Sequence, residues 1–170
     1  MKEKILKLRS LSVVFISCLL IYSCSKDSNK EDLVGTWTFD NATFATMVGD
    51  QTMANYLVNV LGYTSLQAQA FETLFNETVK QKFAGTFQVN SDNTFTSDMG
   101  GEADAGTWTL SSDRKTLTID SDTGDPVTLD VIELTKSKLH VQTVETLTED
   151  LNQDGTDETL VVTIDINFKK

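Results

Sequence analysis

From residue 84 to the end of the chain, apolar and polar residues alternate in short runs that turn residues separate. The pattern predicts three hairpins, with turns at Ser91-Asp92-Asn93, at Ser112-Asp113 and at Lys136-Ser137. The run ETLVVTIDINFKK predicts a last strand, and LVGTWTF (33–39) predicts the first. Consecutive strands with short turns form an antiparallel meander, so we expect a mainly β fold, a barrel of about eight strands.

Between the first strand and residue 84, the hydrophobic period is helical. It predicts an insertion of two helices over roughly 50–61 and 65–82. Thr64 followed by Gln67 is a capping box at the start of the second helix. The residues expected to line one apolar face of that helix are Leu66, Ala70, Leu74, Phe75 and Val79.

The N-terminus is typical of an exported protein. A basic segment precedes an apolar run of about 12 residues, which is too short to cross a ~30 Å hydrocarbon core as a helix. The sequence Leu20-Ile21-Tyr22-Ser23-Cys24 resembles the lipobox of bacterial lipoproteins, in which the Cys receives lipid and becomes the new N-terminus; Tyr22 departs from that pattern. An ordinary signal peptide with an incidental Cys is the alternative.

The resulting domain prediction is a lipoprotein signal peptide at 1–23, a tether at 24–32 and the barrel domain at 33–170. Lipid at Cys24, with two or three acyl chains, would hold the protein to a membrane. The expected location is the cell envelope, at the outer membrane, with the periplasmic or surface face left open.

Composition restricts the chemistry of the mature chain. Cys18 leaves with the signal peptide and Cys24 carries lipid, so no thiol remains for a disulfide or a metal. About 147 residues are enough to bury a core of ordinary size. The formal charge is −11, and the first 23 residues carry +3, so the remainder carries −14. Such an acidic domain is not expected to bind nucleic acid or, by its own surface, anionic lipid.

The sequences around the two tryptophans resemble a known family. LVGTWTF is similar to the Gly-x-Trp start of lipocalins and other calycins, and GTWTLSSDRKTLTI with VTLDVIELTKSKLHV resembles lipocalin-like domains of Gram-negative lipoproteins. The resemblance covers most of residues 33–147 and implies a lipocalin-like barrel with Trp37 and Trp108 in its core. The helices at 50–82 and the acidic loop at 150–158 depart from it, and ligand specificity does not follow from it.

No catalytic residue is predicted, and an enzyme is not expected. His140 is the only histidine and has no Cys partner, so neither a zinc site nor a Ser–His triad is expected. The abundant carboxylates are assigned to turns, where Asp forms local hydrogen bonds: Asp120, Asp122, Asp125 and Asp130.

Bulky apolar residues decide whether the barrel is hollow. Eight strands can enclose either a packed core or a small cavity. Several large side chains indicate substantial filling: Phe39, Phe87, Phe95, Trp108 and Phe168. Phe44, Met47 and Met53 are interpreted as core residues, with the wall of a pocket between helices and barrel as the alternative.

The stretch TEDLNQDGTDETL resembles a calcium-binding DxDxDG loop. Calcium takes 6–8 oxygen ligands, and alternate residues on a tight loop can point inward together. The predicted ligands are Asp150, Asn152, Asp154, the carbonyl of Thr156, and Glu158. Residues 149–158 carry −5 without a basic residue, so calcium is expected as a structural ion of the last hairpin. An acidic turn that binds no ion is the alternative.

The functional prediction is a lipid-anchored lipocalin-like module of the envelope that serves as a binding or accessory protein. Its expected partners are the membrane, through Cys24, and a small hydrophobic ligand or an envelope protein. The alternative is a structural or protein-interaction component of an outer-membrane assembly, with a filled barrel and no small ligand.

Overall fold

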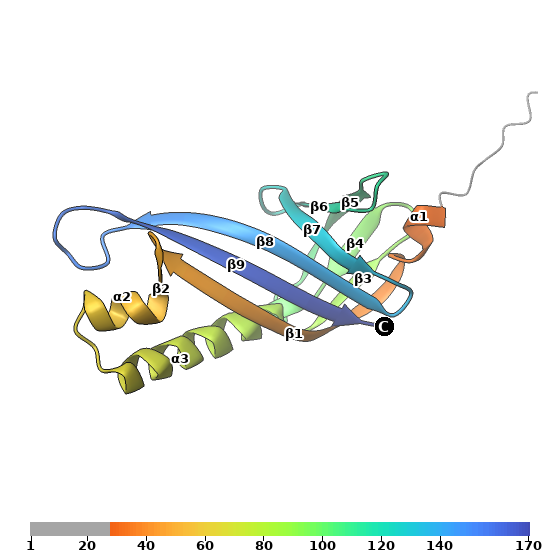
Figure 1. Cartoon of the computed structure of the whole chain (residues 1–170). Coiled ribbons are helices and arrows are strands. Elements are labelled where there is room, and N and C mark those ends of the chain that lie inside the picture. Colours follow the sequence, from red (N-terminus) through yellow and green to blue (C-terminus); the bar gives the residue numbers. More distant parts are fainter. Residues whose placement is uncertain (1–27) are drawn as a thin grey trace, which may run out of the picture.

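The computed structural model describes residues 28–170, whose strands form a closed antiparallel barrel. The sheet order is β2-β1-β3-β4-β5-β6-β7-β8-β9, and β9 pairs back to β1. Eight strands close the ring, while β2 pairs only with the end of β1. The predicted mainly β barrel with a two-helix insertion is confirmed (Figure 1). The strands are β1 (Gly35–Val48), β2 (Gln51–Thr52), β3 (Thr86–Val89), β4 (Thr94–Ser97), β5 (Asp104–Leu110), β6 (Thr116–Ser121), β7 (Val127–Leu134), β8 (Lys138–Glu149) and β9 (Glu158–Lys169).

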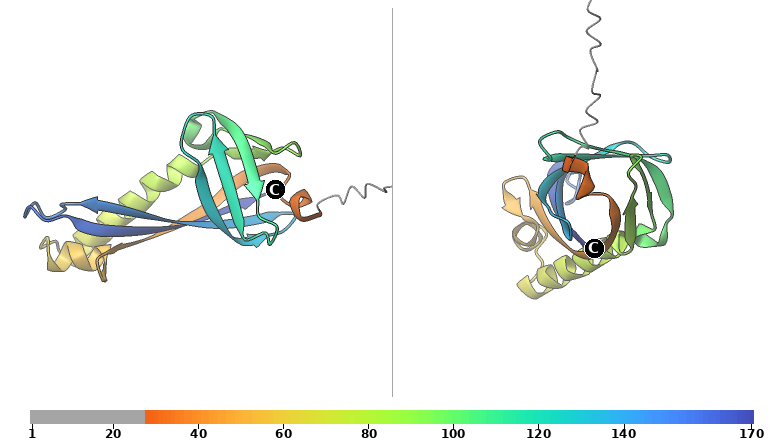
Figure 2. Two further views of the ribbon diagram at one scale, coloured as in Figure 1. Left: turned by 90° about the horizontal axis from the view of Figure 1, so that it is seen from above. Right: turned by 90° about the vertical axis from the view of Figure 1, so that its right-hand side faces the viewer.

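Three of these strands are much longer than the barrel needs. β1, β8 and β9 run on together beyond the ring as a three-stranded antiparallel ribbon (Figures 1 and 2). We call this ribbon the arm; it comprises residues 43–48, 144–149 and 158–163. The helices α2 (Met53–Asn59) and α3 (Ser65–Phe83) lie along one side of the arm. α3 leads from the tip of the arm back to the barrel.

The first strand was predicted to end at Phe39, but β1 continues to Val48. The pairing of β1 with β9 shifts between Phe39 and Asn41, which is a β-bulge. One extra residue changes which positions face the same side, so the strand no longer follows a single alternating pattern. Trp37 points into the core before the bulge, and Ala42 is buried after it.

Bulky side chains close the barrel at the end far from the arm. Leu33 and Trp37 are fully buried there, and Trp108 is 2% exposed. The Trp37 indole donates to the carbonyl of Leu33 at 2.7 Å, and the Trp108 indole donates to that of Asn90 at 3.1 Å. Because both polar groups are paired, the rings are buried at little electrostatic cost. The prediction that Trp37 and Trp108 are core residues is confirmed.

The two helices form where the sequence predicts them, at 53–59 and 65–83, and the capping box of Thr64 and Gln67 is present. The predicted apolar face of α3 is wrong at its two leucines. Leu66 is 77% exposed and Leu74 is 69% exposed, whereas Ala68 is buried. Phe83 packs against the barrel core directly before β3, so the helix docks through the side that Ala68 and Phe83 share. Ala70 is exposed, Phe75 is 38% exposed and Val79 is half-buried.

Short helical segments complete the described chain: α1 (Ser28–Glu31) and the 3₁₀ turn η1 (Met99–Gly101). α1 lies inside the segment predicted as a tether, 24–32, and leads into the buried Leu33 at the closed end. The predicted signal peptide at 1–23 and the predicted lipidation at Cys24 lie outside the described residues. Among residues 28–170, no helix is long and apolar enough to cross a membrane.

Candidate functional site

The barrel is hollow in the half that opens toward the arm. A cavity of about 290 Å³ occupies this half, and we call it the lumen. Its floor includes Phe87, Phe95 and Phe168, whose rings contact one another, with centroids 5.4 Å apart for Phe87 and Phe95 and 6.5 Å for Phe87 and Phe168. The walls are mainly inward-facing aliphatic side chains: Leu117, Ile119, Val127, Leu129, Leu139, Val141, Ile164 and Ile166.

The aromatic residues that were predicted to fill the barrel therefore fill only part of it. Trp108 belongs to the packed layer at the closed end, and Phe39 packs against Phe168 at its side. The eight strands thus enclose both a solid base and an empty upper half, which combines the two alternatives that the sequence left open.

Two carboxylates line the lumen, and its remaining lining is apolar except for Ser97 and Thr143. Asp104 is the first residue of β5, and its Oδ1 accepts hydrogen bonds from the Ser121 hydroxyl at 2.7 Å and from the Ala105 amide at 2.8 Å. Glu145 lies on β8 and is exposed. No Lys, Arg or His of residues 28–170 lines the lumen. Its opening therefore carries only negative charge.

Sequence reasoning missed Asp104 and Glu145, although a signal was present. Asp104 has the same strand phase as Trp108 and Leu110, which are buried. Glu145 has the same phase as Leu139 and Val141. An acidic residue in the inward phase of a strand marks a place where the inner wall meets water or a ligand.

A second cavity, of about 370 Å³, lies between the helices and the arm. We call it the groove. Phe44, Met47 and Met53, which were interpreted as core residues, line it together with Phe71 and Phe75 of α3. The structure supports the pocket alternative for Phe44 and Met47, whereas Met53 both lines the groove and packs against a small buried cluster of Val48, Tyr56 and Leu160. The remaining lining residues are Ala45, Thr46, Thr52, Glu72, Asn76, Leu147, Leu151, Leu160 and Val162.

The acidic loop joins β8 to β9 at the tip of the arm, and its side chains bond its own backbone. Asp150 accepts hydrogen bonds from the amides of Asp154 and Gly155 at 3.1 and 2.9 Å. Asn152 Oδ1 accepts from the Asp154 amide at 2.8 Å, and Asp154 accepts from that of Thr156 at 2.8 Å. The first three predicted calcium ligands therefore gather on one side of a tight turn.

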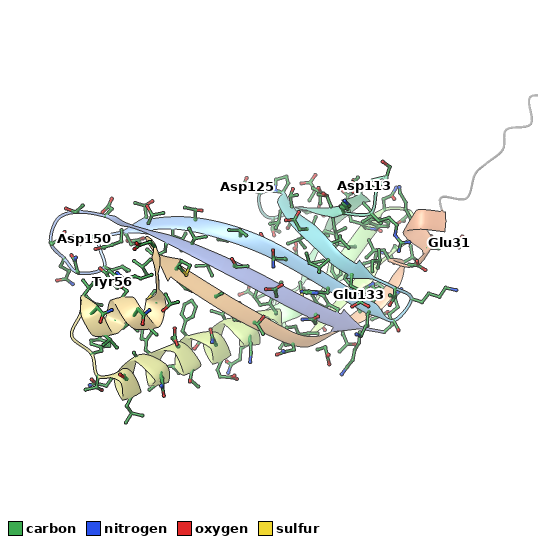
Figure 3. The ribbon with its side chains drawn as sticks, viewed as in Figure 1. Glu31, Tyr56, Asp113, Asp125, Glu133 and Asp150 are labelled. Atoms are coloured by element: carbon green, nitrogen blue, oxygen red, sulfur yellow. The ribbon has the colours of Figure 1, made fainter. Side chains whose placement is uncertain are left out.

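Glu158, the last predicted ligand, is held differently. One carboxylate oxygen accepts from the Tyr56 hydroxyl at 2.7 Å, and the other accepts from the Leu151 amide at 2.8 Å. Tyr56 lies on α2 close to the loop that begins at Asp150 (Figure 3). Within residues 28–170, no three His, Cys, Asp or Glu side chains are grouped so as to hold a metal. Asn152 and the Thr156 carbonyl would have to supply part of any calcium shell.

Local contacts shift the pKa of two groups near this loop. The hydrogen bond from the Asn152 side chain, followed by that from the Thr156 amide, lowers the pKa of Asp154. Burial, followed by the hydrogen bond to Glu158, raises the pKa of Tyr56 to about 12. Asp154 is therefore ionised and Tyr56 protonated at neutral pH, and Tyr56 stays a donor to Glu158.

The other titratable candidates lie outside both cavities. His140 Nε2 is 2.9 Å from Asp165 Oδ1, in a pair between β8 and β9 whose strand phase faces away from the lumen. Asp122 and Asp125 lie in the turn between β6 and β7, as predicted. Asp120 and Asp130 instead lie within strands β6 and β7, with their side chains exposed. The structure brings none of these carboxylates into a cavity.

A family model, rather than a solved structure, identifies what this chain is related to. Among solved structures, the chain is similar to a DUF4847 family protein from Bacteroides vulgatus, with 13% identity and a TM-score of 0.42. That match covers 82% of this chain and 95% of the other. A search of curated proteins found no match. The model of the lipocalin-like domain family matches residues 33–141, which is more than half of the chain. The chain therefore belongs to the lipocalin-like domain family.

Proposed function

We propose that this protein is a lipid-anchored binding module of the cell envelope whose lumen takes a small apolar ligand. The lipocalin-like barrel suggests a binding module, and the unfilled lumen of about 290 Å³ is the observation that carries the proposal. An apolar cavity of ~150 Å³ admits benzene, and small-molecule sites span ~300–1,000 Å³. The lumen is therefore large enough for a short alkyl or aromatic ligand.

The charge of the lumen restricts the class of ligand. Asp104 and Glu145 are its ionisable lining residues. A ligand carboxylate or phosphate near them would be repelled and would lack a basic partner within the lining. A hydroxyl can donate to a carboxylate, and an ammonium can also attract it. We therefore infer an apolar ligand with a neutral or cationic head, in preference to a fatty acid.

Calorimetric titration of the mature domain with three ligands of equal chain length tests this proposal. Decylammonium and decanol are expected to bind saturably below their micelle concentrations. Decanoate is expected to bind about tenfold more weakly than decylammonium, a difference of ~1.4 kcal/mol. Equal binding of all three would contradict the role of Asp104 and Glu145. The absence of saturable binding by any of them would contradict the ligand proposal.

Two tryptophan substitutions on one strand supply the matched control. Leu129 of β7 lines the lumen, whereas Ile132 of the same strand is 55% exposed and lines neither cavity. Leu129→Trp should fill the lumen and remove binding, and Ile132→Trp should bind like the wild type. Circular dichroism of both variants checks that the barrel is intact.

The anchor is a separate part of the proposal and rests on Cys24 and the sequence before it. The position of the closed end supports one orientation of the barrel relative to the membrane. α1 leads into the closed end of the barrel, beside Trp37 and Trp108. If lipid at Cys24 anchors the protein, the solid base would face the membrane, and the lumen and the arm would point away from it. Cells fed a palmitate analogue should label the wild type and leave Cys24→Ser unlabelled. Equal labelling would contradict the anchor.

The alternative function, a protein-interaction component of an envelope assembly, is favoured by the outer side of α3. Leu66 and Leu74 are 77% and 69% exposed there, and apolar side chains that gather on one exposed face can mark a protein contact. Crosslinking in cells from a photoreactive residue at position 66 would reveal a protein that covers this side. A crosslinked partner combined with no small-molecule binding would favour this alternative.

A further inference from the structure

The groove between the helices and the arm is a second cavity, separate from the lumen. Most of its lining is apolar, yet water reaches it, because Phe71 and Phe75 of α3 are 42% and 38% exposed. Leu147 of β8 lines the same cavity and is 51% exposed. When an apolar molecule replaces the water in such a cavity, apolar side chains leave contact with water, and this lowers the free energy of the complex.

The lumen and the groove lie end to end along the same strands. On β9, Leu160 and Val162 line the groove, and Ile164 and Ile166, which share their face, line the lumen. On β8, Leu147 lines the groove and Glu145, two residues earlier, lines the lumen. Two residues along a strand span about 7 Å. The inner wall of the barrel therefore continues without a break as the floor of the groove.

Two aromatic side chains stand between the cavities. Phe44 of β1 lines the groove and pairs in register with Ile164, which lines the lumen. Phe83, the last residue of α3, lines the lumen. Their ring centroids are 6.2 Å apart, with an angle of 31° between the planes. The partition at this place consists of side chains, which change rotamer far more easily than a strand moves.

We propose that the two cavities form one elongated site for a single long-chain amphiphile, which runs from the lumen past Phe44 and Phe83 into the groove. This inference rests on the proposed function of the lumen. The packed floor accepts one end of the chain, and the groove accepts the part that the lumen cannot hold. Each cavity alone is close to the lower end of the ~300–1,000 Å³ range of ligand sites.

The same charge restriction applies along the whole path. Glu72 is the ionisable residue of the groove, and no Lys, Arg or His of the described chain lines either cavity. The occupant is therefore a long-chain compound with a neutral or cationic head, such as a long-chain amine. The polar lining of the groove offers hydrogen-bond partners for that head: Thr52 is exposed, and Glu72 and Asn76 are half-buried.

A chain-length series of alkyltrimethylammonium ions, from octyl to hexadecyl and below their micelle concentrations, tests the elongated site. In the wild type, affinity should rise by about fourfold for each methylene that leaves water, and the rise should continue to the longest chains. Thr46→Trp should block the groove; it should bind the octyl ion like the wild type and lose most of the gain from longer chains. Thr43→Trp, on the opposite face of the same strand, is the matched control.

The outcomes separate the two proposals. Octyl and hexadecyl ions of equal affinity, or a Thr46→Trp variant that matches the wild type at every length, would overturn the elongated site and leave the lumen proposal standing. No binding at any length would overturn the lumen proposal itself. If Thr46→Trp does not fold, photolabelling of the wild-type protein decides between the two cases.

In that experiment, a photoreactive group on the last chain carbon should label lumen residues, and one next to the head should label groove residues. Labelling of the same cavity by both groups would refute the elongated site.

Discussion

Strand β8 buries its apolar residues at one end and exposes them at the other. In the barrel, Leu139 is 1% exposed and Val141 is fully buried, whereas in the arm Leu147 is 51% exposed on the same face. The barrel half of the strand has neighbours on both edges and a closed ring around its inner face. The arm half keeps only β9 as a partner and is only partly covered by helices.

The difference shows that two kinds of burial coexist in one sheet. Ring closure buries most inward side chains below the mouth of the lumen, because the opposite strands supply the other half of the core. In the arm, α2 and α3 must supply that half, and α3 directs its leucines outward instead. We therefore expect the base of the barrel to carry the stability, and the arm to tolerate change and to carry adaptable surface. Four predictions, from the largest expected effect to the smallest, test this contrast.

The largest effect should come from the closed base. Trp37→Ala removes a fully buried indole and leaves a cavity, so we expect a loss of about 3–5 kcal/mol in the free energy of unfolding. Phe75→Ala in the groove, where the side chain is 38% exposed, should cost about 1 kcal/mol or less. Urea unfolding followed by circular dichroism measures both. Equal losses would refute the division into a stable base and a tolerant arm.

Two glycines extend the contrast to the backbone. A Cβ on Gly106 of β5 would overlap the Asp120 carbonyl oxygen, so the strands would have to separate. Gly106→Ala should therefore cost at least about 2 kcal/mol. At Gly155 in the acidic loop, φ is +88° and no atom lies within 4 Å of the added Cβ, so Gly155→Ala should cost only about 1 kcal/mol of backbone strain. Thermal melts rank the two, and the reverse order would contradict the argument.

Calcium should stabilise the protein through the acidic loop at the tip of the arm. At a calcium concentration of about ten times the dissociation constant, binding to the loop adds ~1.4 kcal/mol, which raises the melting temperature by about 3–5 °C. Asp154→Ala should lose this response. Asp157→Ala, which removes a charge from the same loop without removing a predicted ligand, should keep it. An unchanged melting temperature of the wild type in millimolar calcium would identify the loop as a turn only.

The smallest effect concerns Tyr56 at the tip of the arm. Its pKa is raised from 10.0 to about 12, first by burial and then by Glu158. The folded protein holds this proton more tightly than the unfolded chain, so the associated stability is complete below pH 10 and is lost as the pH rises from 10 to 12. Between these pH values, Tyr56→Phe should lose less stability than the wild type. Tyr63→Phe changes an exposed ring and should follow the wild type. The measurement is the free energy of unfolding as a function of pH, and identical curves for all three proteins would contradict the prediction.

Local patterns predicted the elements of this fold well, and they failed where a distant contact decides. The turns around Asp92, Asp113 and Ser137 and the capping box at Thr64 depend on a few neighbouring residues, and all are present. The end of β1 was placed nine residues too early, because the bulge after Phe39 interrupts the alternation. The buried side of α3 was misplaced, because the attachment of Phe83 to the barrel core outweighs the helix's own weak amphipathicity.

The sequence by itself determined that this chain forms an antiparallel meander with Trp37 and Trp108 inside, since alternation and turn residues act over a few positions. It also determined the absence of thiols from the chain after Cys24, which follows from composition. Only the tertiary structure decided that the barrel is filled in one half and hollow in the other, and that Phe44, Met47 and Met53 line a groove. The reason is that a cavity is the difference between the space that strands and helices enclose and the volume of side chains from every part of the chain. No local pattern contains that difference.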